Sequence, residues 1–199
     1  MKEALDHLRK DRRLAKVIDQ VGEYSITITK NPYESLVEAI ITQQLSGKAA
    51  DSISTRFRGI YGKFPKPVDV LKTPNSKLRK AGLSYMKVSY IKDLSERVES
   101  KELRLSYMKK LSDEEVIEQL VQVKGIGRWT AEMFLIFNLG RLDVLPIGDL
   151  GLKKGIQRLY SLSELPQKEQ MEKIAKRWRP YRSVATWYLW RSLNQFDIG

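Results

Sequence analysis

Apolar residues recur at intervals of three and four positions along most of the chain, which is the spacing of one buried helix face. Capping signals frame these stretches. Asn31 followed by Pro32 predicts a helix that runs through Ile41, and Ser112 with Glu115 forms a capping-box pattern. We find no hairpin signal or alternating strand series, and the strand-like stretch SITIT is short enough to be a connector. The sequence therefore predicts an all-α fold.

The same signals set approximate bounds for the other helices, because glycines close several and prolines open others. In the helix expected to begin at Ser84, the apolar positions include Tyr85, Val88, Ile91 and Leu94. The remaining expected helices are a first one over 5–21, one from the Ser46-Gly47 break to Tyr61, a short one that Thr73-Pro74 opens and Gly82 closes, one from Ser112 to the glycine turn at 124–127, one over 129–139, one over 150–160, one from Pro166, and one from Pro180 to about Asn194.

Length and charge bound the class of protein and its partners. A chain of 199 residues with 42% hydrophobic content can form one compact domain or two small lobes. Its net charge of +12 favours polyanionic partners, nucleic acid first and an anionic membrane second. No apolar run approaches the roughly 20 residues that span a bilayer, and the start lacks a signal-peptide core. We therefore expect a cytoplasmic protein, associated with the nucleoid if it is bacterial.

Two residue types exclude several kinds of chemistry. The chain has no cysteine, so disulfides, thiolate zinc sites and cysteine-ligated iron–sulfur clusters are ruled out. Its single histidine, His7, lies in a charged amphipathic stretch and is expected to be a solvated helix residue. Histidine triads and multi-histidine metal sites therefore drop out, and no catalytic metal is expected.

The most specific local signal is LVQVKGIGRWTAEMFLIF at 120–137, where two helical stretches flank a tight turn. Glycines at 125 and 127 let the backbone approach a phosphate closely, and successive N–H groups at a helix start bind anions. An ordinary connection between two helices is the alternative. The phosphate-binding interpretation names Lys124, Gly125, Ile126, Gly127, Arg128 and Thr130.

A single aspartate follows the second of these helices. Asp149 stands between glycines in LPIGDLGLKKG, after a proline-containing loop and at an expected helix start. Its backbone surroundings would hold a carboxylate in place for catalysis. The alternative is an N-cap aspartate, which stabilises a helix by about 1 kcal/mol.

The segments KGIGRWTAEMF, LPIGDLGLKKG and RWRPYRSVATWYLW, in this order, resemble the helix-hairpin-helix (HhH-GPD) DNA glycosylase superfamily, and most of all its 3-methyladenine DNA glycosylase II branch. The resemblance covers about residues 32–194. It implies one glycosylase domain with the active-site cleft between two helical lobes, approximately 45–145, which contains the hairpin, and 1–44 with 146–199. It also implies a monomer that acts on damaged double-stranded DNA, with Asp149 as the catalytic carboxylate.

Further site residues are carried over from the resembling segments. QQLSGKAA at 43–50 matches the segment whose leucine fills the gap left by a flipped base, which makes Leu45 the wedge with Gln44 beside it. Trp190 matches the tryptophan that stacks on the extruded base. For both Leu45 and Trp190, an ordinary core position is the alternative. The remaining implied residues are Trp129, Met133 and Trp187 at the base pocket and Lys153 and Lys154 at phosphates.

The departures from other branches narrow the implied activity. Bifunctional members carry a lysine nucleophile in the helix after the hairpin, and this chain has Trp129 there. Strand cleavage is therefore not expected, and neither is an organic cofactor, although hairpin carbonyls could hold Na⁺ or K⁺. We expect a monofunctional glycosylase for alkylated purines. The alternatives are a glycosylase for another damaged or mismatched base, a non-catalytic helix-hairpin-helix DNA-binding module, and a basic scaffold for an acidic protein.

Overall fold

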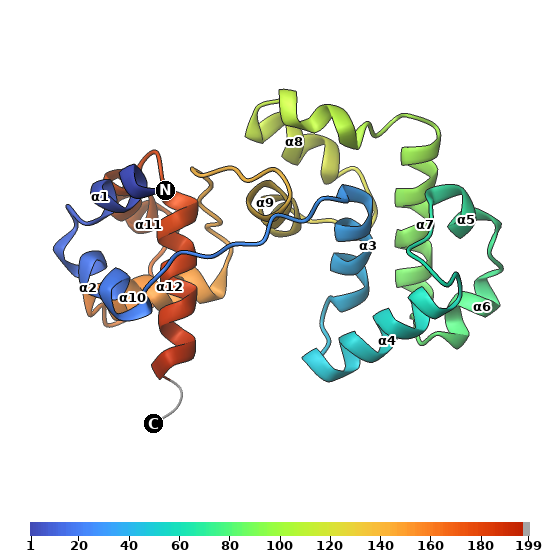
Figure 1. Ribbon diagram of the computed structural model, residues 1–199, viewed down its shortest axis with the longest axis horizontal. Helices are drawn as coiled ribbons and strands as arrows, with labels where there is room; N and C mark the ends of the chain where they lie inside the picture. Colours follow the sequence, from blue (N-terminus) through green and yellow to red (C-terminus); the bar gives the residue numbers. More distant parts are fainter. Residues whose placement is uncertain (197–199) are drawn as a thin grey trace. The chain divides into compact units, whose positions relative to one another are not determined.

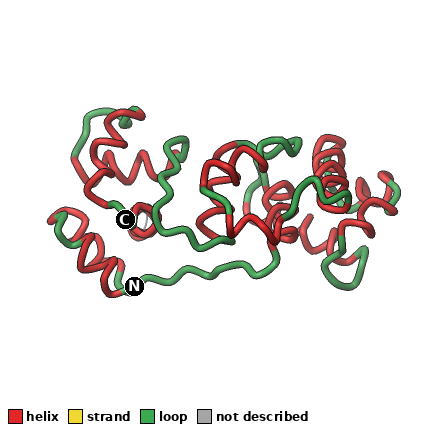
Figure 2. Tube along the Cα trace, turned by 90° about the horizontal axis from the view of Figure 1, so that it is seen from above, coloured by secondary structure: helices red, strands yellow, loops and turns green. Residues whose placement is uncertain are grey.

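The computed structural model describes residues 1–196, with side chains described through residue 193. Within this range the chain consists of helices and loops without a strand (Figure 2), which confirms the predicted all-α class. The SITIT stretch is a loop. None of the described helices is long and apolar enough to cross a membrane.

The chain forms two compact units. The terminal unit combines Met1–Ile28 with the chain from Leu135 onward, and the central unit is Thr29–Phe134. These bounds differ from the expected lobes in two places. Residues 29–44 belong to the central unit because helix α3 (Pro32–Thr42) packs on α4 (Gly47–Gly59) and α7 (Tyr85–Glu99). Residues 135–145 belong to the terminal unit, where the Leu142 carbonyl accepts a hydrogen bond from Ser183 N at 2.9 Å.

The terminal unit is built around its last helix, α12, which packs on α2 and α10 (Figure 1). Its core contains the fully buried side chains of Trp178 and Tyr188 together with Leu152 and Ile156. The helices of this unit are α1 (Lys2–Leu8), α2 (Arg12–Val21), the end of α9, α10 (Leu150–Tyr160), α11 (Lys168–Ala175), the 3₁₀ helix η2 (Lys176–Trp178) and α12 (Arg182–Phe196).

Two helices replace the single helix expected over 5–21. Asp11 interrupts the pattern because its side chain accepts hydrogen bonds from the backbone N–H groups of Arg13 at 3.1 Å and Leu14 at 3.4 Å. An aspartate that bonds the backbone in this way begins a new helix and does not continue the old one. The sequence pattern was therefore right about the apolar face and wrong about continuity.

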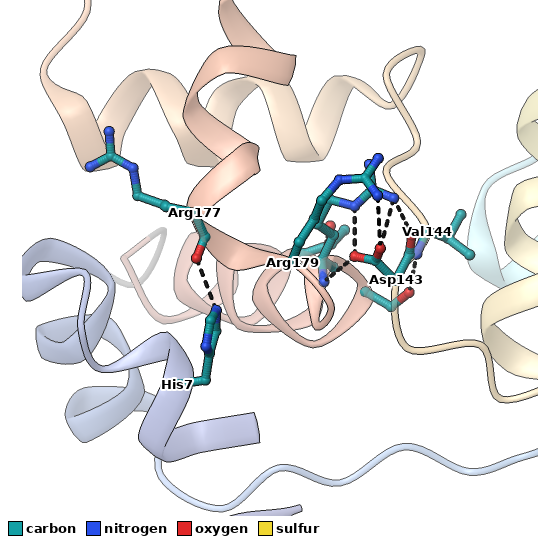
Figure 3. A network of polar contacts seen from close by, with 8 residues as sticks. His7, Asp143, Val144, Arg177 and Arg179 are labelled. Carbon is teal, nitrogen blue, oxygen red and sulfur yellow. Dashed lines mark hydrogen bonds and ion pairs between the residues drawn. The ribbon is translucent and has the colours of Figure 1, made fainter. Parts of the chain in front are cut away.

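Polar contacts fasten the loop before α10 to the start of α12 and α1 to η2 (Figure 3). The guanidinium of Arg182 donates to Asp143 Oδ1 at 2.7 Å and Oδ2 at 3.0 Å, and Arg179 donates to Oδ2 at 3.5 Å. His7 Nε2 donates to the Arg177 carbonyl at 3.0 Å. His7 is therefore half-buried and bonded to the backbone rather than freely solvated.

In the central unit, α7 packs against α5, α3 and α6 (Figure 1). Its buried positions are Val88, Ile91 and Leu94, as predicted, but Tyr85 is 77% exposed. The Tyr85 ring instead lies under the guanidinium of Arg79, 4.0 Å from its centroid. The other helices of this unit are α5 (Pro67–Lys72), α6 (Asn75–Lys80), the 3₁₀ helix η1 (Leu105–Lys110), α8 (Asp113–Leu120) and the start of α9 (Arg128–Phe137).

Several boundaries in the central unit differ from the expected ones. The sequence patterns did not predict α5 and η1, which are six residues each. Pro74, and not Thr73, is the N-cap of α6, because the Thr73 hydroxyl donates to the Asp69 carbonyl at 2.7 Å instead of capping the next helix. The predicted caps at Asn31 and Ser112 and the start at Ser84 are all confirmed.

Candidate functional site

Asp149 begins α10 in the terminal unit and is 9% exposed. Its Oδ1 accepts a hydrogen bond from Leu152 N at 2.6 Å, which is the N-cap contact. The same oxygen also accepts from the Trp190 indole Nε1 at 2.7 Å. Asp149 is therefore an N-cap, as the alternative interpretation of the sequence predicted, but capping does not account for the indole donor. The second donor fixes the carboxylate more firmly than capping requires, because two N–H groups meet at one oxygen.

Trp190 has a defined place beside this carboxylate. One face of its indole stacks on Phe137, with ring centroids 6.1 Å apart and planes 16° from parallel. Gly151 leaves room for this arrangement, since a Cβ there would lie 3.0 Å from Trp190 Cδ1 and 3.1 Å from Asp149 Oδ1. A side chain at 151 would therefore have to displace the indole or the carboxylate by a few tenths of an ångström.

The other predicted residues of the terminal unit lie in two kinds of surroundings. Trp187 is 8% exposed and makes edge contacts with Tyr24 and Tyr188 in the hydrophobic core, so its position is that of a core aromatic. Lys153 and Lys154 lie in the first turns of α10, one half-buried and one exposed. Asp149, Trp190 and the two lysines are therefore close together along α10 and against α12, whereas Trp187 packs in the core.

The glycine turn of the central unit connects α8 to α9. Gly125 has a φ of +82°, and a Cβ on it would lie 2.1 Å from Tyr90 Cδ2. Positive φ and the ring beneath it both require glycine here. A Cβ on Gly127, by contrast, would meet nothing within 4 Å. The open space over Gly127 is available to a group that approaches from outside.

The remaining hairpin residues do not form one uniform phosphate site. Lys124 is exposed, whereas the side chains of Ile126 and Thr130 are buried, so Ile126 can offer only its backbone. The Arg128 guanidinium donates to both carboxylate oxygens of Glu114, at 2.7 and 2.8 Å, and this contact raises the pKa of Arg128. Arg128 is therefore held by acidic neighbours, which the sequence pattern did not reveal.

The predicted wedge follows the end of α3. Gln44 has a φ of +57°, a strained value for a residue with a side chain, and Leu45 is 37% exposed. The core alternative for Leu45 therefore does not hold. Gln43 Nε2 donates to the Gly125 carbonyl at 2.8 Å and ties this turn to the hairpin.

A cavity of about 490 Å³ in the central unit brings several predicted residues together. It is a mainly apolar cavity of the size that small-molecule sites have. Leu45 is not among its lining residues, and Trp129 is 48% exposed. The cavity is lined by Ala39, Thr42, Gln43, Gln44, Gly125, Gly127, Trp129, Thr130 and Met133.

Three residues of α7 support both the wedge turn and the hairpin, and the sequence interpretation missed them. The Lys87 ammonium donates to the carbonyls of Ile41 and Gln43, each at 2.8 Å, and burial lowers its pKa. The Tyr90 ring lies under Gly125, and Asp93 Oδ2 accepts from Lys124 N at 2.9 Å. Their spacing of three puts them on one helix face. That spacing was the available signal.

The hairpin offers backbone carbonyl oxygens as cation ligands. Among the described residues, no group of three or more histidines, aspartates and glutamates could hold a metal ion. In the hairpin, the Gly125 carbonyl accepts from Gln43 and the Val123 carbonyl from Ile126 N at 3.0 Å. Each carbonyl retains a second lone pair, which suits a monovalent cation but no transition metal.

Similarity to known proteins agrees with this arrangement. The chain is similar to DNA-3-methyladenine glycosylase 1 of Schizosaccharomyces pombe, with 38% identity across 94% of this chain and 83% of that protein. The solved structure of an S. pombe 3-methyladenine DNA glycosylase in complex with abasic DNA superposes with a TM-score of 0.88, 36% identity and 99% coverage of both chains. A DNA-3-methyladenine glycosidase from Bacillus halodurans gives 0.87 at 40% identity, covering 96% of this chain and 88% of that one.

A family match extends over most of the same region. Residues 37–180, which include the hairpin and Asp149, match the family described as HhH-GPD superfamily base excision DNA repair protein. The match confirms the family resemblance expected from the sequence. The protein therefore belongs to the HhH-GPD superfamily of base excision DNA repair proteins.

Proposed function

We propose that the protein is a monofunctional DNA glycosylase. It would extrude an alkylated purine such as 3-methyladenine from duplex DNA and hydrolyse the N-glycosidic bond, leaving an abasic site. The observation that carries this proposal is the fixed carboxylate of Asp149, whose Oδ1 accepts both the Leu152 N–H and the Trp190 indole N–H. The similarity to named 3-methyladenine glycosylases over almost the whole chain supports the choice of substrate.

The chemistry needs one carboxylate. Alkylation at N3 or N7 makes the purine a cation, so the base departs as a neutral molecule with the electron pair of the bond from C1′. The deoxyribose then becomes oxocarbenium-like, and the Asp149 carboxylate stabilises that positive charge. Water adds to C1′, and its proton passes to the carboxylate or to solvent. Because the carboxylate is already held by two N–H groups, little reorganisation accompanies the reaction.

Aromatic and polarizable side chains suit such a base. A cationic purine is attracted to aromatic faces, and Trp190 and Trp129 are the proposed contacts, with Met133 as a softer one. Phe137 stacks on one face of Trp190, and the base is proposed to stack on the opposite face. No lysine stands at 129, so the sugar would not be attacked by an amine and the strand would stay intact.

The central unit would bind the damaged duplex. Exposed Leu45 is proposed to fill the gap left by the extruded base, with Gln44 beside it. Gly125 and Gly127 would present N–H groups to phosphates, assisted by Lys124, while Lys153 and Lys154 would do so beside Asp149. Such a protein would act where the chromosome is, in the cytoplasm and associated with the nucleoid if the organism is bacterial.

A monovalent cation is a further part of the proposal. Na⁺ or K⁺ would be held by hairpin carbonyls such as those of Val123 and Gly125, where it would add positive charge next to a bound phosphate. Duplex affinity should then fall when these ions are replaced by a bulky organic cation at equal ionic strength. Equal affinity in both salts would contradict the cation site.

The test is release of free bases from duplex DNA treated with a methylating agent, comparing the wild-type protein with Asp149→Asn. Asparagine is as good an N-cap as aspartate, so folding and DNA binding should be retained. We expect the wild type to release 3-methyladenine and leave strands that break only in alkali, and the variant to release it about 10²–10⁴-fold more slowly.

Two other outcomes point to the alternatives. Release of a different base from a panel of defined lesions would show a glycosylase of other specificity. Duplex binding without base release from any lesion would identify a non-catalytic helix-hairpin-helix module, in which Asp149 only caps α10.

A further inference from the structure

A second group of basic residues lies in the terminal unit, at the start of α2. Lys10, Arg12 and Arg13 are exposed there, and Arg177 of η2 joins them around a cavity of about 470 Å³. Asp11 is the one acidic residue that lines this cavity. The local balance is thus four positive charges to one negative.

The single carboxylate in this group is already occupied. Asp11 Oδ1 accepts from the backbone N–H groups of Arg13 and Leu14, and Oδ2 accepts from the Tyr160 hydroxyl and from Trp178 Nε1 at 3.2 Å. Asp11 therefore serves the fold and does not pair directly with the surrounding cations.

The four basic side chains differ from several arginines elsewhere in the protein. Arg58, Arg97, Arg128 and Arg182 each form ion pairs with carboxylates. Within residues 1–193, neither Lys10, Arg12, Arg13 nor Arg177 has a carboxylate oxygen within 4.0 Å of its charged nitrogens. Figure 3 shows the guanidinium of Arg177 pointing away from His7 and from Asp143.

An aromatic ring holds two of these cations in place. The Arg13 guanidinium lies 5.1 Å from the centroid of the Tyr160 ring, and that of Arg177 lies 5.8 Å from it. Burial and the hydrogen bond to Asp11 raise the pKa of Tyr160, so its hydroxyl stays a neutral donor. Two like charges are therefore kept near one ring without a counter-ion, an arrangement that a bound anion would stabilise.

The positive surface is longer than a single anion. Arg13 also lines an adjoining cavity of about 380 Å³, together with Lys16 and Arg158. Basic side chains at successive points along one surface match a chain of phosphates better than an isolated one.

This surface is separate from the proposed reaction site. Asp149 caps the start of α10, whereas Tyr160 is its last residue. Eleven helical residues span about 16 Å. The phosphates bound here would belong to nucleotides other than the one that reacts.

We infer that Lys10, Arg12, Arg13, Lys16, Arg158 and Arg177, the α2 basic surface, form a second DNA-binding site. It binds backbone phosphates of duplex DNA irrespective of sequence or damage. The choice of DNA as the polyanion rests on the proposed function. The existence of a basic surface rests on the structure alone. Its role is to hold the protein on undamaged DNA away from the lesion.

The experiment measures affinity for an undamaged duplex of about 20 base pairs between roughly 50 and 200 mM salt. The triple variant Arg12→Gln, Arg13→Gln, Arg177→Gln is compared with Lys72→Gln, Lys77→Gln, Lys80→Gln, which removes the same charge from exposed positions of α5 and α6. Each lost phosphate contact lowers the slope of log affinity against log salt by about 0.9. We expect this slope to fall by about 2–3 in the arginine triple variant and by less than about 1 in the lysine triple variant.

An unchanged slope in the first variant, or an equal loss in both, overturns the proposal. The single variant Arg12→Gln is a control for misfolding, because the exposed Arg12 side chain forms no hydrogen bond or ion pair with another described residue, and its expected loss of slope is about 1. Base release by saturating enzyme should not change in any of these variants. The wild type could release no base while the two triple variants still differ in salt slope. That result would contradict the glycosylase proposal and support the DNA-binding surface.

Discussion

Asp11 and Asp149 are two aspartates in nearly the same local setting. Each is 9% exposed, each caps a helix of the terminal unit, and each accepts an indole N–H, from Trp178 and Trp190 respectively. They differ in how the donors are distributed. Asp11 receives side-chain donors from Tyr160 of α10 and Trp178 of η2, whereas Asp149 receives one from Trp190 of α12.

The donors of Asp11 give it the surroundings of a structural carboxylate. Four hydrogen bonds spread over Asp11 stabilise its charge and join α2 to the core through Tyr160 and Trp178. At Asp149 the indole donor is Trp190, which is only half-buried and is the residue proposed to stack on the extruded base. Capping and burial alone therefore do not distinguish the two aspartates, whereas the burial of the tryptophan that donates to each one does.

The strongest test of the difference between Asp11 and Asp149 is to replace each of them by asparagine. At 149, the amide oxygen can keep both donors, so the melting temperature should change by about 1 °C or less while base release is lost. At 11, an amide nitrogen would face Tyr160 or Trp178, and a lost charged hydrogen bond costs about 2 kcal/mol. Melting should fall by about 4–8 °C with base release retained. Equal effects on stability would contradict the comparison.

Replacing each tryptophan donor by phenylalanine should change base release less than replacing the aspartates does. Trp190→Phe keeps an aromatic ring on Phe137 but deletes the N–H that reaches Asp149, and we expect base release to slow about 10–100-fold. Trp178→Phe should lower the free energy of unfolding by about 1–3 kcal/mol without slowing release. Single-turnover release and thermal melting measure the two effects. A Trp190→Phe enzyme of full activity would show that the indole does not position the carboxylate.

The smallest expected effect is the acid dependence of stability. Burial alone would raise the pKa of the Asp11 carboxyl, but its hydrogen bonds together hold that pKa below the usual 3.8. The resulting stability is present above pH 4 and lost as pH falls through the lowered pKa. The stability difference between wild type and Asp11→Asn should therefore shrink below about pH 4, as urea titrations at several pH values would show. A constant difference would mean that charge plays no part.

The sequence predicted much of this protein because its signals are local. The caps at Asn31, Ser84 and Ser112 depend on contacts three residues away, and the structure confirms them. The family resemblance depended on the order of three segments, and it too is confirmed. The roles of Leu45, Trp190 and Asp149 stay predictions, although their observed positions suit those roles.

What the sequence could not provide depends on contacts between distant residues. The bonds from Tyr160 and Trp178 to Asp11 join positions 149 and 167 residues apart, so no periodicity reveals them. Arg128 was assigned to phosphate because its neighbours are glycines, but Glu114 is its partner across the hairpin. The α2 basic surface was also hidden, since acidic residues nearby in the sequence balance its charge and Arg158 and Arg177 join it from distant parts of the chain.

The position of the Asp149 carboxylate depends on the Cβ atom that Gly151 lacks. Its hydrogen occupies the space where any other residue would bring a carbon against the indole and the carboxylate. Glycine has no functional group, so a list of candidate site residues chosen by their chemistry omits this position. Evolution of a new specificity in this protein can change the residues that touch the base, but a side chain at position 151 would have to displace the Trp190 indole or the Asp149 carboxylate by a few tenths of an ångström.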